Sequence, residues 1–267
     1  MNLTRTAAIF LRHFYLVRGS VARVLPLFVW VTVDMTLWGF MSRYLNKVAA
    51  PGYNFVPALL GAVLLWDFFI RVMQGVTTAF FEDVWSRNFL NIFATPLSIS
   101  EYLGGMVLSS IGTSSIGLLV MLILSTTVFG LSFFTYGVLL LPFLLVLFLF
   151  GIALGILGSS VVLRYGPAAE WFVWPIPALI SPFAGVFYPL STLPAWMRTI
   201  SYVLPPSYVF ESMRALVNGQ TLSATSLLIS TTLAVLQLLL AGYFFARVFR
   251  YAVRTGLLAR YSAEATS

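Results

Sequence analysis

Apolar residues fall into six long runs along the chain, separated by shorter polar or proline-containing stretches. A helix needs roughly 20 apolar residues to cross about 30 Å of hydrocarbon, because each residue adds about 1.5 Å. The runs are of this order, so they predict an all-α membrane protein in which residues 1–267 form a single transmembrane domain. We expect the six transmembrane helices at residues 24–40, 56–80, 102–129, 136–163, 171–188 and 222–249.

The first 20 residues follow a different, amphipathic pattern. Their apolar side chains recur at steps of four and three and share one helical face, while Arg5 and Arg12 lie opposite. Together with Arg18, these arginines interrupt the apolar core that a cleavable signal peptide would need. Residues 1–20 therefore predict an N-terminal interfacial helix whose basic side faces anionic lipid.

A second amphipathic segment, residues 193–217, precedes the last span. Each half has about a dozen residues, which is too short to cross the bilayer, and Pro205 and Pro206 separate the halves. We expect a re-entrant pair of external helices between the fifth and sixth spans. The fifth span itself contains three prolines, which favour either a kinked packing helix or a flexible gate wall.

The composition places these helices in lipid rather than in water. Hydrophobic residues make up 60% and charged residues 9% of the chain, whereas a soluble domain averages about 25% charged residues. The net charge of +7 comes from basic residues mostly at the ends of the apolar runs, which is typical of anchoring at lipid headgroups and not of nucleic-acid binding. Cysteine is absent and His13 is the only histidine, so we expect neither a disulfide nor a metal cluster.

The distribution of basic residues also predicts an orientation. Arg43, Lys47, Arg198 and Arg214 fall outside if the N-terminus lies in the cytoplasm. Since basic residues concentrate on the cytoplasmic side, we expect both termini there, which requires an even number of spans. The ten arginines that then face the cytoplasm are Arg5, Arg12, Arg18, Arg23, Arg87, Arg164, Arg247, Arg250, Arg254 and Arg260.

Motifs of known enzyme chemistry are absent from the sequence. It contains no phosphate-binding P-loop, no serine-hydrolase elbow and no zinc-protease motif. Its eight acidic residues are scattered along the chain. We therefore expect no catalytic residues and no enzyme activity, so that any transport must draw its energy from a partner or from a gradient.

Three charged residues lie inside the first two spans. Asp34, Asp67 and Arg71 each cost about 2.5–3.5 kcal/mol on insertion scales, and Asp67 and Arg71 are one helical turn apart, so they can pair. Counted along the helices, the three lie at nearly one depth, which predicts an intramembrane charge network. Such a network could fix the packing of the two spans, line a pathway for a polar headgroup or relay protons.

The segment at residues 82–98, between the second and third spans, is long and amphipathic. Its aromatic and aliphatic side chains recur at helical spacing, and Pro96 ends the pattern. A cytoplasmic helix of this kind is a natural docking element for a partner, and the alternative is a helix that lies on the membrane. The candidate docking residues are Glu82, Asp83, Trp85, Arg87, Phe89 and Phe93.

Two motifs together indicate a family. The first is this acidic-start segment, which ends in Ala94-Thr95-Pro96-Leu97-Ser98. The second and more specific one is Gly185-Val186-Phe187-Tyr188-Pro189-Leu190-Ser191-Thr192-Leu193-Pro194-Ala195-Trp196, followed by Leu204-Pro205-Pro206-Ser207-Tyr208 and Arg214. With its span layout, the chain resembles the permeases of type-2 ABC exporters, the class that includes drug, polysaccharide and nodulation-factor exporters. The resemblance covers nearly the whole chain.

The resemblance implies how the parts work. Residues 82–98 would be the coupling helix that fits a cleft on the nucleotide-binding subunit, and residues 193–217 would be the external helices. Two copies of this chain, a homodimer, would pair with two copies of an ABC ATPase subunit that binds ATP and Mg, in a bacterial inner (cytoplasmic) membrane. The implied external gate comprises Phe187, Tyr188, Trp196, Pro205 and Tyr208. Many members have Asn-Pro where this chain has Leu204-Pro205-Pro206, a departure that bears on the conformation of that gate.

The leading hypothesis is therefore ATP-driven export of an amphipathic or lipid-linked compound from the cytoplasm or the inner leaflet. The glycines of Gly151-x-x-x-Gly155 would permit the close helix packing that such a machine needs. The alternatives are a proton-driven secondary transporter and a non-transporting membrane scaffold. No broken helices are paired in two halves of the chain, which argues against the secondary transporter. An ATPase encoded beside this chain would favour export over both alternatives.

Overall fold

The computed structural model describes residues 2–48, 56–132, 136–221 and 223–258, and these residues form helices and their connections without a strand. Five of the helices are long and apolar enough to cross a membrane. They cover Val21–Val48, Val56–Trp85, Ile99–Thr127, Gly137–Tyr165 and Ala224–Arg254. The predicted all-α class of a multi-pass membrane protein is therefore confirmed.

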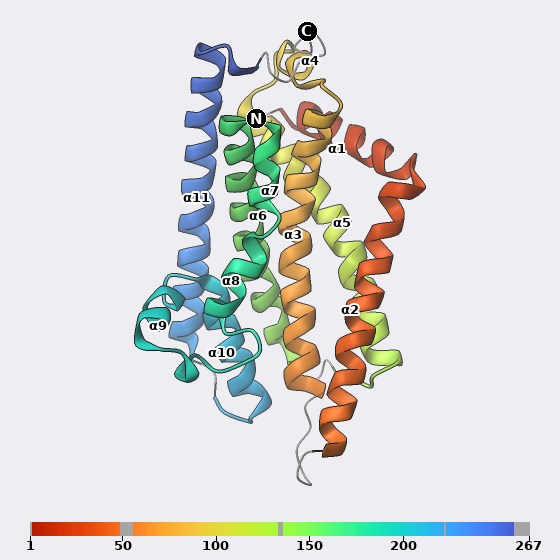
Figure 1. Ribbon diagram of the computed structural model, residues 1–267, viewed down its shortest axis with the longest axis vertical. Coiled ribbons are helices and arrows are strands. Elements are labelled where there is room, and N and C mark those ends of the chain that lie inside the picture. Colours follow the sequence, from red (N-terminus) through yellow and green to blue (C-terminus); the bar gives the residue numbers. More distant parts are fainter. Residues whose placement is uncertain (1, 49–55, 133–135, 222, 259–267) are drawn as a thin grey trace.

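The long helices alternate with short ones along the chain (Figure 1). The π-helical turn η1 continues directly into α3, and the 3-10 turn η3 continues into α6. In order, the elements are α1 (Leu3–Arg18), α2 (Val21–Val48), η1 (Val56–Leu60), α3 (Gly61–Trp85), α4 (Phe89–Phe93), α5 (Ile99–Thr127), η3 (Gly137–Leu139), α6 (Leu140–Tyr165), η4 (Pro167–Ala169), α7 (Glu170–Val173), α8 (Ile176–Ala184), η5 (Leu190–Thr192), α9 (Ala195–Ser201), α10 (Pro205–Val217) and α11 (Ala224–Arg254).

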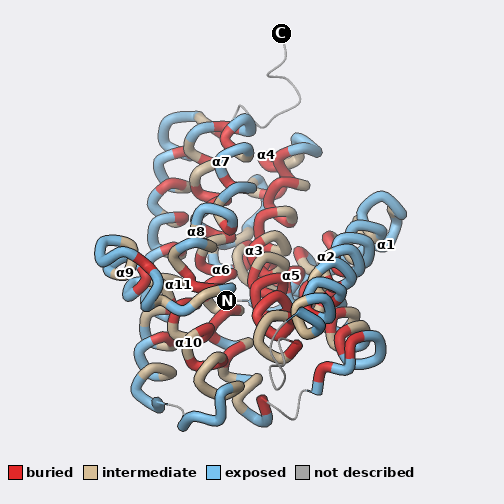
Figure 2. Tube along the Cα trace, turned by 60° about the horizontal axis from the view of Figure 1, so that its bottom comes forward, coloured by how far each residue is buried: buried red, intermediate tan, exposed pale blue. Residues whose placement is uncertain are grey.

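Helix α3 occupies the centre of the bundle, where it packs against α5 and α6, while α11 packs against α6 (Figure 1). Most of α3 is buried, whereas α2 and α11 carry exposed residues along their length (Figure 2). Many of the exposed side chains are large and apolar, such as Leu37 on α2, Leu119 on α5 and Leu239 on α11. Because lipid tails are as apolar as leucine, this exposure fits a bundle that is surrounded by a bilayer.

The two ends of the bundle carry different short helices (Figure 1). Helices α1 and α4 lie at one end, where α11 also finishes, whereas α9 and α10 lie at the opposite end. Helix α1 runs across the bundle rather than along it and packs against α5 and α2. The two sequence motifs that indicate a family thus lie at opposite ends of the molecule.

The predicted fifth span at residues 171–188 is not one continuous helix. Helices α7 and α8 are separated by Trp174 and Pro175, because proline has no N–H to donate and cannot continue the hydrogen-bond pattern of the preceding turn. Gly185 then ends α8 with a left-handed φ of 62°. Among the described residues, five helices are therefore long enough to span a membrane, and this segment consists of two shorter ones.

Helix boundaries differ most from the sequence prediction around the first span and around residues 82–98. The sequence predicts a first span at residues 24–40 followed by a polar loop, whereas α2 continues to Val48, since neither glycine nor proline interrupts its last two turns. The sequence predicts one helix at residues 82–98, whereas only the five-residue α4 forms there. Helix α3 extends to Trp85 and α5 already begins at Ile99, so only a short segment remains between them for a separate helix.

Parts of three predictions lie outside the described residues. They are the first residue of the interfacial helix, the first residue of the span at 222–249 and the basic tail with Arg260. Ser223 caps α11, residues 224–249 of the last span lie within α11, and the segment at 193–217 contains α9 and α10.

Candidate functional site

The connection between α3 and α5 holds the short helix α4. Helix α3 ends at Trp85, and Arg87 then adopts a left-handed φ of 52°, which turns the chain before α4 begins. Helix α5 starts from a capping box, in which the Ser98 hydroxyl accepts from the N–H of Glu101 and the Glu101 carboxylate accepts from the N–H of Ser98. Local sequence thus sets where α3 ends, where α5 begins and how long the connection between them is.

Aromatic side chains pack α4 against three long helices. Phe89 is buried, with its ring centroid 5.5 Å from that of Phe80 on α3 and 6.1 Å from that of Tyr102 on α5. The ring of Phe93 lies 5.0 Å from Tyr102 and 4.5 Å from Phe249 on α11. Such aromatic pairs contribute about 0.5–1.5 kcal/mol each beyond their buried area. A force on α4 is therefore transmitted to α3, α5 and α11.

Asp83 forms a buried link between α1, α3 and α5. Its side chain is 0% exposed, pairs with the guanidinium of Arg12 and accepts a hydrogen bond of 2.8 Å from the Tyr102 hydroxyl. The nearby His13 has its Nε2 atom 4.0 Å from the second Asp83 oxygen. Burial, opposed by Asp83 and reinforced by Arg12, lowers the pKa of His13 below its ordinary value of 6.5. The sequence predicts Asp83 on the polar side of a docking helix. In the structure it lies in the protein interior, where it pairs with Arg12 and accepts a hydrogen bond from Tyr102.

Two further acidic residues hold the same end together. Glu82 accepts hydrogen bonds of 2.7 and 2.9 Å from Arg23 at the start of α2. Glu101 accepts one of 2.7 Å from the backbone N–H of Asn2, which caps α1. Sequence reasoning missed Glu101, although its capping-box spacing from Ser98 is a readable signal. The pairing of Glu82 with Arg23 joins distant parts of the chain, so no local sequence pattern predicts it.

Only some of the predicted docking residues are accessible to a partner. Trp85 and Arg87 are exposed, and the indole N–H of Trp85 donates to Glu170 at 2.9 Å. Asp83 and Phe89 are buried. The remaining two, Glu82 and Phe93, are half-buried. We define the tip surface as the exposed residues around α4, namely Ser86, Arg87, Asn91, Ala94, Thr95 and Pro96.

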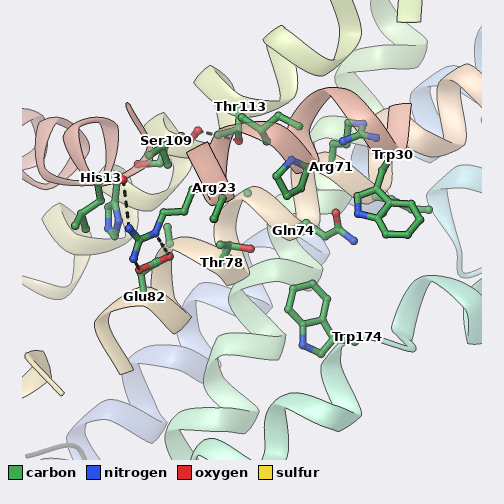
Figure 3. Close-up of a pocket in the computed structure, with 18 of the residues that line it drawn as sticks. His13, Arg23, Trp30, Arg71, Gln74, Thr78, Glu82, Ser109, Thr113 and Trp174 are labelled. Carbon is green, nitrogen blue, oxygen red and sulfur yellow. Dashed lines mark hydrogen bonds and ion pairs between the residues drawn. The ribbon is translucent and has the colours of Figure 1, made fainter. Parts of the chain in front are cut away.

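A cavity of about 550 Å³ lies between α1, α2, α3 and α5. Figure 3 shows the pair of Arg23 and Glu82 at one side of this cavity, towards α1, and the indoles of Trp30 and Trp174 further along it. Trp174 comes from the break between α7 and α8, so the interruption of that segment brings an aromatic ring to the cavity. The space is thus both polar and aromatic.

All three predicted intramembrane charges line this cavity, Asp34 from α2 and Asp67 and Arg71 from α3. Within the described residues, no ion pair of 4.0 Å or less joins them. The Oδ2 atom of Asp67 and the Nε atom of Arg71 are buried without a hydrogen-bond partner there. The side chain of Arg71 lies against α5, where a Cβ placed on Gly117 would be 2.6 Å from its Cδ. The helical spacing that permits a pair of Asp67 and Arg71 therefore does not produce one.

At the opposite end, the segment after α8 is held by contacts from two helices. Phe187 stacks on Trp38 of α2, with ring centroids 4.9 Å and planes 14° apart. The Tyr188 hydroxyl donates to a backbone carbonyl of α8 at 2.7 Å. Arg214 of α10 donates to the Gly185 carbonyl at 2.7 Å. This segment therefore joins α2 and α10 to the end of α8.

The other predicted gate residues lie on α9 and α10. Trp196 on α9 is exposed, and Pro205 is buried at the first position of α10, where its missing N–H leaves no bond unmade. The Tyr208 hydroxyl donates to a backbone carbonyl at 3.0 Å. Sequence reasoning missed Glu211, which accepts from the N–H of Leu190 at 2.6 Å. Its signal was the basic residue three positions later on the same helix, to which it is bound.

A comparison with protein families gives one match. The model of the ABC-2 family transporter proteins matches residues 41–246. The match begins within α2 and ends within α11, so it contains the α3–α5 connection and the segment between α8 and α10. No curated protein matches the chain.

Proposed function

This chain belongs to the ABC-2 family of transporters, and from that membership we propose that it is the permease of an exporter driven by a separate ATPase. Its role in transport and its multi-pass membrane nature follow from the family and the five long helices. The exporter moves an amphipathic or lipid-linked compound out of the cytoplasm or the inner leaflet. ATP and Mg are bound by the partner subunit, because this sequence contains no P-loop.

The observation that carries the proposal is the attachment of α4. Phe89 and Phe93 pack it against α3, α5 and α11, and Asp83 joins the end of α3 to α1. A partner that pushes on the tip surface then displaces membrane helices instead of bending a loose connection. This is the property that coupling between an ATPase and a transmembrane path requires.

The proposal includes a finer topology. We infer six spans, with α7 and α8 together as the broken fifth, and α9 and α10 as a re-entrant pair at the outer surface. Two copies of the chain form a homodimer with two ATPase subunits in a bacterial inner membrane, with α4 and both termini in the cytoplasm. The position of α4 and α9 at opposite ends (Figure 1) and the distribution of basic residues support this arrangement.

Co-purification with the ABC ATPase that this proposal requires as a partner tests the docking role. Asn91 is exposed on the tip surface, so Asn91→Trp places a bulky ring where the ATPase would bind. We expect the amount of retained ATPase to fall about tenfold or more, because the disruption of a central interface residue commonly costs about 2 kcal/mol. The yield and the thermal unfolding of the permease itself should not change.

Asn218→Trp is the matched control. Asn218 is also exposed and ends α10 at the opposite end of the bundle, so the same substitution there should leave the ATPase bound. If both variants retain wild-type amounts of ATPase, the tip surface is not the docking site and the proposal fails.

A proton-driven secondary transporter is the second candidate, and the lining of the cavity favours it. Asp34, Asp67 and Arg71 are intramembrane ionisable groups around one space, and such groups form proton relays in pumps and transporters. A proton-flux assay distinguishes the proton-driven transporter from the ATP-driven exporter. The purified chain is placed in sealed vesicles that contain a pH-sensitive dye, and a pH gradient is applied across their membrane. Our proposal expects no proton movement above that of protein-free vesicles, and a flux abolished by Asp67→Asn would establish the alternative.

A further inference from the structure

The cavity between α1, α2, α3 and α5 is lined by more carboxylates than guanidinium groups. Among the described residues that line it, Arg23 and Glu82 form an ion pair with two hydrogen bonds, so their charges compensate each other. His13 also lines the cavity, and burial lowers its pKa below the ordinary value of 6.5, so it adds no charge at neutral pH. Asp34, Asp67 and Arg71 remain, which are two carboxylates against one guanidinium. Since charges of opposite sign attract strongly away from bulk water, the cavity favours a ligand that brings one more positive charge.

Asp67 is a carboxylate of the cavity lining that has an unpartnered oxygen among the described residues. The residue is 9% exposed, and its Oδ2 atom has no hydrogen bond within the described residues. A buried polar atom without a partner is unfavourable by about 1–3 kcal/mol. Arg71 does not supply that partner, because its side chain lies against Gly117 on α5. The Asp67 carboxyl group therefore has a free acceptor inside a space that is large enough for a small molecule.

The walls of the cavity suit a ligand that is both charged and apolar. Figure 3 shows the indoles of Trp30 and Trp174 on two sides of the Gln74 amide, and aliphatic side chains such as Leu27 and Ile70 complete the lining. The face of an indole ring attracts cations and repels anions. A cation with an apolar body would meet carboxylates and ring faces together, whereas an anion of the same shape would meet repulsion from both.

We propose that this cavity binds an amphipathic organic cation. Its charged centre lies beside Asp34 and Asp67, and its apolar body packs against Trp30 and Trp174. Along α3 the cavity runs from Glu82 to Asp67, a length of about 22 Å at about 1.5 Å per residue, so it leads from the α1 end to the middle of the bundle. Binding is a property of this chain alone, and only the export of the bound cation rests on the proposed function.

Two probes of the same shape and opposite charge test the proposal. Tetraphenylphosphonium and tetraphenylborate are offered to the purified chain in equilibrium dialysis, with protein-free detergent as the background. We expect the phosphonium ion to bind at least about tenfold more tightly than the borate ion. Asp34→Asn and Asp67→Asn should each weaken phosphonium binding about tenfold, and Trp30→Ala should weaken it about fivefold.

Glu170→Gln is the matched control for the carboxylate variants. Glu170 is absent from the cavity lining, and an amide oxygen can still accept from the Trp85 indole, so the variant removes one negative charge and should keep wild-type phosphonium binding. Asp34 is only half-buried, so Asp34→Asn remains informative if Asp67→Asn fails to fold.

Two results would overturn the inference. One is borate binding as tight as phosphonium binding. The other is wild-type phosphonium affinity in both Asp34→Asn and Asp67→Asn. Neither result affects the association of the ATPase with the tip surface, which Asn91→Trp tests separately, so a failure of this inference is distinguishable from a failure of the proposed function.

Discussion

Neighbouring acidic residues with the same sequence signal have different energetic roles in this protein. Asp83 is fully buried beside Arg12, whose side chain is 26% exposed, and loss of one partner of a buried pair costs about 3–5 kcal/mol, with the lower value applying to a partly exposed partner. Glu82 and Arg23 have side chains 14% and 40% exposed, and such pairs contribute about 0–1 kcal/mol. Removal of Asp83 should therefore lower the stability of the fold, whereas removal of Glu82 should mainly change the lining of the cavity.

His13 should make the stability of the fold depend on pH. Its pKa is lowered in the folded state, chiefly by burial, so the unfolded chain binds a proton at a pH where the folded chain does not. Stability is therefore complete above the ordinary value of 6.5 and is lost as the pH falls from there to the folded pKa, by at most about 1.4 kcal/mol per pH unit. Thermal unfolding between pH 8 and about pH 5 measures this effect.

The matched variant for this prediction is His13→Gln, which cannot take up the proton. Its unfolding temperature should change less with pH than that of the wild type over the same interval. An identical pH dependence in the two proteins would show that His13 does not contribute.

At the scale of elements, α6 and α3 pack closely at two glycines. A Cβ placed on Gly151 would lie 2.9 Å from the Val72 side chain, and one on Gly155 would lie 2.7 Å from the Val76 side chain and 3.0 Å from the Met73 carbonyl. The two glycines let the helix backbones approach. The Gly151-x-x-x-Gly155 pattern therefore marks a contact within one chain, between the central helix and its neighbour.

Gly155→Ala should destabilise the protein although alanine favours helix. The added methyl group meets backbone as well as side-chain atoms of α3, and such overpacking costs about 1–3 kcal/mol. Gly242→Ala on α11 is the control, because no described atom beyond its own stretch of helix lies within 4 Å of its Cβ position, and it should stabilise by up to about 1 kcal/mol. Thermal unfolding in detergent compares them, and a stabilised Gly155→Ala would contradict the close contact.

At the scale of the whole molecule, the structure separates two functional ends. One end holds α4 and the Arg12–Asp83 ion pair between α1 and α3, and the other holds α9 and α10 (Figure 1). The cavity reaches from the first end towards the middle of α3. An ATPase at the first end and an exit at the second would place the cavity on the loading side of the path.

Single cysteines test the proposed orientation, because the natural sequence has none. Ser86 on the tip surface and Thr199 on α9 are both exposed. In intact cells, a membrane-impermeant maleimide should label Thr199→Cys and leave Ser86→Cys unlabelled until the membrane is permeabilised. Labelling of Ser86→Cys in intact cells would place the tip surface outside and exclude its contact with a cytoplasmic ATPase.

The sequence by itself determined the class of protein and the family. The thickness of a bilayer requires long apolar runs, so these runs predict transmembrane helices without knowledge of the packing, and five of them are long helices in the structure. The prolines of residues 171–188 indicated a kink, and a break occurs there at Pro175. The family resemblance rested on two local motifs, and the match to residues 41–246 confirms it.

Only the tertiary structure decided which polar residues are buried and what surrounds them. Helical spacing shows which side chains share a face, but it does not show which other helix covers that face. Asp83 lies in the interior, where it pairs with Arg12 of α1. The Oδ2 atom of Asp67 has no hydrogen-bond partner among the described residues, and the side chain of Arg71 lies against α5 instead. The cavity exists because four helices meet around these residues, and contacts between distant parts of a chain leave no periodic signal in its sequence.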